Sequence, residues 1–147
     1  AALWRALEAG RSDWDPDAFL AALRADPTAH CARDAAGRTP LGLAAQTARR
    51  FAARHLLAAR ADPCAGGSRG WTPLHYCAMD GRDSELIGLL VAARADPNAL
   101  TDDGMPAIFY ASNAGHEQTV QALYGAGARR DALARAARQH GGTILGD

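Results

Sequence analysis

Lysine is absent from this chain of 147 residues, so its 16 fixed positive charges are all arginines. The same number of acidic residues brings the net charge to zero. A chain without net charge creates no long-range field, which argues against nucleic acid or an anionic membrane surface as its partner. Aromatic residues are also scarce, at 6%. Because alanine is the commonest residue and the strongest helix former, we expect closely packed helices.

Cysteines and long apolar runs are equally few. Cys31, Cys64 and Cys77 are an odd number at scattered positions, which argues against a disulfide framework and favours reduced thiols. We therefore expect a soluble chain in a reducing compartment, the cytoplasm or the interior of an organelle. The longest mostly apolar run, residues 86–93, is far shorter than the roughly 20 residues that cross a bilayer. The chain opens without Met or a signal peptide, which predicts a trimmed chain or removal of a targeting segment.

What the sequence does contain is a repeat. Asp-Ala-Ala-Gly-Arg-Thr-Pro-Leu at residues 34–41 returns as Ser-Arg-Gly-Trp-Thr-Pro-Leu-His at residues 68–75, with the two Thr-Pro pairs displaced by 33. A degraded third copy at residues 103–108 follows with a displacement of 34. The extra residue is expected near Asp83, between two helices. Self-similarity at this period predicts helical units that must stack to bury their apolar faces.

The repeated segment resembles the signature of the ankyrin repeat family, which has a period of 33 residues and contains Thr-Pro-Leu-His-x-Ala. Residues 72–77 match with Cys in place of Ala, and residues 39–44 match with Gly in place of His. The resemblance is strong over residues 34–128 and weaker at both ends. It implies an all-α fold, a solenoid of stacked helix-turn-helix units with finger loops, flanked by N- and C-terminal helical caps.

Local signals agree with this fold. Thr39 and Thr72 are expected to cap helices whose first residue is proline, and Gly81 and Gly115 are expected to end them in a left-handed conformation. The expected organisation is a single domain with a capping helix pair or degenerate repeat at 1–33, a repeat at 34–66, a repeat with one inserted residue at 67–100, a degenerate repeat at 101–130, and a capping helix with tail at 131–147.

The ends of the helices and of the chain carry further expectations. Arg60 and Arg94 stand where the family usually has glycine after the second helix, and Ala48 replaces a glycine between helices. A side chain at positive φ costs roughly 1 kcal/mol, so we expect these helices to end differently. Helices are also predicted in both caps. The first exposed apolar face is expected to be closed by Trp4, Trp14, Phe19 and Leu23. Gly141 is expected to end the last helix.

Serine, histidine and cysteine residues of the kinds that act in enzyme active sites are present, but the sequence around them does not match that of an active site. Residues 66–70 spell Gly-x-Ser-x-Gly, but a nucleophile elbow needs a strand before the serine and a helix after it. His75 and Cys77 lie two apart on an expected helix and diverge, and the resemblance implies a structural role for His75. No cysteine or histidine spacing matches a zinc site. We therefore predict that the protein is not an enzyme and binds neither a cofactor nor a metal. The alternative is an enzyme that uses Cys77 or Ser68.

The resemblance implies a concave binding surface made by the finger tips and the first helix of each unit. Tryptophan, methionine and arginine on such a surface favour protein contacts. Carried over position by position, the candidates for contact with a partner protein are Arg38, Gln46, Thr47, Arg69, Trp71, Met79, Asp80, Asp103, Met105 and Asn113. Packing against the neighbouring finger is the alternative for Trp71, and packing between units is the favoured expectation for Tyr76 and Tyr110. A solvated basic face is expected at Arg49, Arg50 and Arg54.

The sequence therefore predicts a non-enzymatic module that binds another protein through its concave face, with no nucleic acid partner and no membrane-spanning segment of its own. The alternative is a small structural subunit of a larger complex, such as a photosynthetic or respiratory assembly in an organelle. A partner within a membrane complex is compatible with both. The identity of that partner does not follow from the fold.

Overall fold

The computed structural model describes residues 2–140, which form a row of helix pairs with no β-structure in that range beyond one bridge between Leu100 and Pro106. This all-α architecture confirms the expected fold class. The helices are α1 (Ala2–Glu8), α2 (Pro16–Ala25), α3 (Pro40–Gln46), α4 (Arg50–Ala58), α5 (Pro73–Asp80), α6 (Glu85–Ala92), α7 (Ala107–Asn113), α8 (Glu117–Gly125) and α9 (Arg130–His140).

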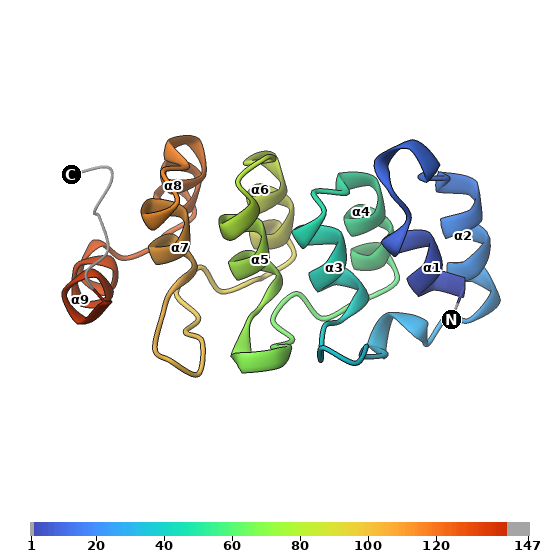
Figure 1. Cartoon of the computed structure of the whole chain (residues 1–147), viewed down its shortest axis with the longest axis horizontal. Coiled ribbons are helices and arrows are strands. Elements are labelled where there is room, and N and C mark those ends of the chain that lie inside the picture. Colours follow the sequence, from blue (N-terminus) through green and yellow to red (C-terminus); the bar gives the residue numbers. More distant parts are fainter. Residues whose placement is uncertain (1, 141–147) are drawn as a thin grey trace.

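The pairs stack side by side into a solenoid (Figure 1). The first helices contact one another in the order α1, α3, α5, α7 and α9, while α2 packs on α4 and α6 packs on α8. Long finger loops extend from the same edge of the row before α5 and before α7. None of the described helices is long and apolar enough to cross a bilayer.

Equivalent residues of successive units form one continuous apolar core. Leu41, Leu74 and Ile108 occupy the same position near the start of α3, α5 and α7, and each is buried. The second helices contribute buried leucines as well, among them Leu56 and Leu90. No single pair encloses these side chains, so each unit depends on its neighbours for burial.

Thr39 and Thr72 begin their helices as expected. The Thr39 hydroxyl accepts a hydrogen bond from the Gly42 N–H at 3.1 Å. His75 reinforces the second start: its Nδ1 accepts from the Thr72 N–H at 3.1 Å, and its Nε2 lies 3.0 Å from the Met105 carbonyl oxygen. Nδ1 therefore carries no proton and Nε2–H donates to Met105, which ties α5 to the next finger. Burial lowers the pKa of His75, which favours this neutral form.

The expectation that helices ending at arginine or alanine adopt another geometry is wrong. Arg60, Arg94 and Ala48 all have positive φ, at 70°, 76° and 55°. Hydrogen bonds that close the helix offset the conformational cost. After α4, for example, the Ala61 N–H donates to the Leu56 carbonyl at 3.0 Å. Gly81 and Gly115 also adopt the left-handed conformation. The expectation for Gly141 concerns a residue outside the described range.

The link between α5 and α6 is one residue longer than the links between α3 and α4 and between α7 and α8. It contains Asp83, whose two carboxylate oxygens accept from Arg50 of the preceding unit at 2.9 Å each. This contact with Arg50 holds the pKa of Asp83 below its usual value. The longer link thus joins two neighbouring units through a paired charge.

Candidate protein-binding groove

A groove with a volume of about 760 Å³ lies between two successive finger loops and the helices that follow them, α3 and α5. Its lining residues are Ala36, Arg38, Gln46, Ser68, Arg69, Trp71, Tyr76, Met79 and Asp80. Six of these nine residues are contact candidates predicted from the sequence, and Tyr76 was expected to pack between units.

Aromatic rings form the apolar part of the groove. The Trp71 ring lies 5.4 Å from that of Tyr76 and 4.4 Å from that of Tyr110, measured between ring centroids. Trp71 therefore packs between units, through Tyr110 of α7, and also lines the groove while half-buried. Its aromatic partners lie on helices α5 and α7.

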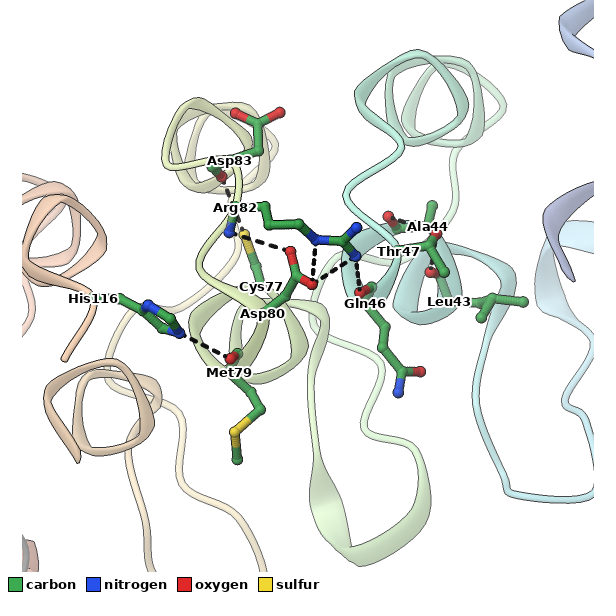
Figure 2. A network of polar contacts seen from close by, with 10 residues as sticks. All are labelled: Leu43, Ala44, Gln46, Thr47, Cys77, Met79, Asp80, Arg82, Asp83 and His116. Atoms are coloured by element: carbon green, nitrogen blue, oxygen red, sulfur yellow. Dashed lines mark hydrogen bonds and ion pairs between the residues drawn. The ribbon is translucent and has the colours of Figure 1, made fainter. Parts of the chain in front are cut away.

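Ion pairs fix several polar groups along the groove. Arg38 Nε donates to the Asp34 carboxylate at 2.7 Å, and Arg38 Nη1 donates to the Gln46 side-chain oxygen at 2.9 Å. On the other wall, Asp80 pairs with Arg82 at 2.7 Å. Figure 2 shows the Arg82 guanidinium between that carboxylate and the Gln46 backbone carbonyl of the preceding unit. Because these charged groups pair with one another, they contribute little to the net charge of the groove and mainly fix its shape.

Two of the exposed lining residues offer groups for contact with a partner. Met79 is 46% exposed, and its thioether extends away from the carbonyl that accepts from His116 (Figure 2). Arg69 is exposed in the finger loop at positive φ, and its guanidinium makes no hydrogen bond or ion pair within residues 2–140. The groove therefore presents a flexible apolar group and an unpaired positive charge beside an aromatic floor.

Four of the ten candidate contact residues lie outside this groove. Asp103 and Asn113 are exposed in the next unit. The Thr47 hydroxyl donates to the Leu43 carbonyl at 2.8 Å, so its hydrogen is already committed. Met105 is only 3% exposed, and the expectation that it presents an anchor to a partner is wrong. Its unbranched, flexible side chain joins the core.

The expected solvated basic face is also wrong in part. Arg50 forms ion pairs with Asp83 and Glu85, and the Arg49 guanidinium stacks on the Trp14 ring, 4.4 Å from its centroid. Local charge patterning does not reveal this contact, because Trp14 lies far from Arg49 in the sequence. Arg54 is exposed, as expected.

The groups considered for catalysis lie apart. Ser68 opens a short 3-10 turn, Ser68–Gly70, without the strand that a nucleophile elbow requires. Cys77 Sγ lies 3.6 Å from the Asp83 carbonyl oxygen, whereas His75 contacts Thr72 and Met105. Burial raises the pKa of Cys77 to about 12, so the thiol is protonated at neutral pH. Within residues 2–140, no three histidine, cysteine or acidic side chains gather as metal ligands.

A thiol titration tests this arrangement. Cys31 and Cys64 are exposed and Cys77 is buried. We expect the native protein to react with a chromogenic disulfide reagent at Cys31 and Cys64 within minutes, while Cys77 reacts only at the rate at which the fold opens. Full denaturation should release the third thiol. Fast reaction of Cys77 in the native state, located by mass spectrometry, would contradict its placement in the core.

The stacked hairpins, finger loops and groove define a helical repeat protein. Comparison with known families agrees: a model described as ankyrin repeats (3 copies) matches residues 3–99, and one described as ankyrin repeats (many copies) matches residues 78–124. The chain belongs to the ankyrin repeat family. It is also 40% identical over 92 residues to human neurogenic locus notch homolog protein 4.

The match to that relative is partial. It covers 61% of this chain but only 4% of the relative's length, so it concerns the repeats alone. Ankyrin repeats generally serve as non-enzymatic modules for protein–protein interaction. This is the class of function that the chain's family defines.

Proposed function

We propose that the chain binds a partner protein by accepting its side chains in the groove between the two finger loops. One observation carries the proposal: residues from two successive units, far apart in the sequence, line a single cavity of about 760 Å³. Concave surfaces of stacked repeats present such multi-unit sites to a partner. The concave face thus acts as the recognition surface, and no chemical step is required of it.

The chemistry of the groove sets the kind of side chain it accepts. Trp71, Tyr76 and Met79 supply apolar surface, and Arg69 supplies an unpaired positive charge beside it. A partner segment that presents an apolar residue next to an acidic one matches both features. Rigid aromatics together with arginine are the residue types that dominate binding energy at protein interfaces.

The double variant Arg69→Gly with Met79→Ser tests this proposal. Both side chains are accessible, and glycine at residue 69 also suits the positive φ of that position. The partner is first captured by the wild-type chain from its source and identified by mass spectrometry, and its affinity is then measured by calorimetry. We expect Kd to rise about 30-fold, equivalent to about 2 kcal/mol, with the melting temperature unchanged or higher.

Matched changes elsewhere on the surface provide the control. Arg60→Gly makes the same replacement at another positive-φ arginine, and Leu100→Ser removes another exposed apolar side chain, 53% exposed. Neither residue lines the groove. This control pair should bind the partner as the wild type does. Equal losses in the two double variants would refute the groove as the site of recognition.

A further inference from the structure

A second cavity, of about 400 Å³, shares no lining residue with the groove. It is formed where the loop between α1 and α2 meets the link between α3 and α4. Its lining combines three arginines with two aromatic residues: Arg11, Trp14, Thr47, Ala48, Arg49, Arg50 and Phe51. A hollow lined by charges of one sign concentrates the electrostatic field and raises the local concentration of anions.

Arg49 is the central residue of this cavity. Its guanidinium stacks on Trp14 and donates through Nη2 to the Ala9 carbonyl oxygen. Its Nε is buried without a hydrogen-bond partner, and no carboxylate among residues 2–140 pairs with this guanidinium. Burial, and then the nearby charges of Arg11 and Arg82, lowers the pKa of Arg49. A half-buried cation among like charges lacks the compensation that such groups normally have.

The neighbouring charges are not equivalent. Arg50 is already neutralised, since it pairs with Asp83 at 2.9 Å and with Glu85 at 2.8 Å. Arg11 is exposed and its side chain makes no polar contact within the described range. Arg11 and Arg49 therefore leave two uncompensated positive charges at the cavity.

We propose that this cavity binds a phosphate monoester group, held by Arg11 and Arg49. A phosphate monoester carries about −1.5 to −2 charges at neutral pH, which matches the two uncompensated cations. Its oxygens accept the paired N–H groups of a guanidinium, a geometry that Arg11 offers and in which arginine surpasses lysine. Arg49, whose Nη2 already donates to the Ala9 carbonyl, adds its positive charge. The α4 helix also starts at this cavity, and its N-cap residue, Arg49, makes no side-chain capping bond. The positive end of its dipole adds to the attraction for an anion.

A titration with inorganic phosphate, followed by NMR at constant ionic strength, tests the site. We expect saturable shifts of the backbone amide signals of residues 47–51, with chloride at equal ionic strength producing none. Acetate should bind at least tenfold more weakly than phosphate, because it carries a single charge. Equal shifts with acetate, or no saturable shift with phosphate, would overturn the proposal.

The variant Arg11→Gln locates the binding energy without disturbing the fold, because the Arg11 side chain has no polar contact within residues 2–140. Because the variant loses a charge-assisted hydrogen bond to the phosphate, we expect Kd for phosphate to rise at least tenfold. Arg24→Gln removes the same charge from an exposed residue of α2 and should leave Kd unchanged. Equal weakening by both variants would show nonspecific attraction and contradict the site.

Two sources present this group: a phosphorylated side chain and a free phosphorylated small molecule. A peptide containing phosphoserine, titrated beside inorganic phosphate, separates them. Tighter binding of the peptide assigns the group to a protein segment, whereas equal affinity assigns it to a small molecule. Both results support the phosphate site, which stands independently of the groove.

Discussion

Replacing His75 by alanine should destabilise the protein by about 3–5 kcal/mol, since it opens a cavity in the core and removes buried hydrogen bonds. The imidazole is fully buried between α5 and the following finger. Without it, the Thr72 N–H and the Met105 carbonyl lose partners on the two sides of a unit boundary. Denaturation by urea, followed by circular dichroism, measures this loss as a lower midpoint.

Because the hydrogen bond from His75 to the Met105 carbonyl joins two units, the shape of the unfolding transition gives a second readout. Because repeat arrays are stabilised by contacts between neighbouring units, weakening one boundary should also broaden the transition or split it in two. His30→Ala provides the control, since among residues 2–140 the His30 side chain hydrogen-bonds only to the exposed Cys31 thiol, at 3.3 Å. That variant should change stability by less than about 0.5 kcal/mol. A loss below about 1 kcal/mol for His75→Ala would contradict the bridging role of His75.

Gly81→Ala should be the second severe change, at about 2–3 kcal/mol. Gly81 has a φ of 69°, a conformation that side chains rarely adopt. A methyl group there would also meet the His116 ring, which lies against this glycine and bonds the Met79 carbonyl oxygen at 3.2 Å. The substitution therefore adds backbone strain and displaces a contact between units. Thermal unfolding by calorimetry provides the measurement.

Gly115→Ala is the matched control. Gly115 has a similar φ of 79°, but a methyl group added there would meet no atom within 4 Å. Only the backbone cost of roughly 1 kcal/mol should appear. Equal losses for the two variants would show that His116 does not matter for the junction, whereas a larger loss for Gly81→Ala isolates its contribution.

The repeats and the helix starts were predictable because they depend on local sequence. A Thr-Pro pair displaced by 33 residues implies a second, similar unit, and a threonine before a proline specifies a helix start without tertiary information. The groove followed from the same periodicity. Once the units were aligned, Arg38 and Trp71 had to occupy equivalent places in neighbouring fingers, and both line the groove.

The errors concern properties that depend on contacts across units. Met105 occupies the same finger position as Arg38 and Trp71, yet its side chain is buried, because an apolar thioether can enter the core whereas a guanidinium must keep its polar partners. Arg60 and Arg94 tolerate positive φ because helix-closing hydrogen bonds, which sequence does not display, offset the strain. Arg49 was expected to be solvated, but in the fold its guanidinium stacks on the Trp14 ring.

The most direct test of the proposed recognition surface is an NMR map of the bound state, recorded as the captured partner is titrated into the labelled chain. The largest signal changes should fall on Arg38, Arg69, Trp71 and Met79, which come from two units and share the groove. Changes confined to the opposite row of helices, α2, α4, α6 and α8, would contradict the account and place recognition on the other face of the solenoid.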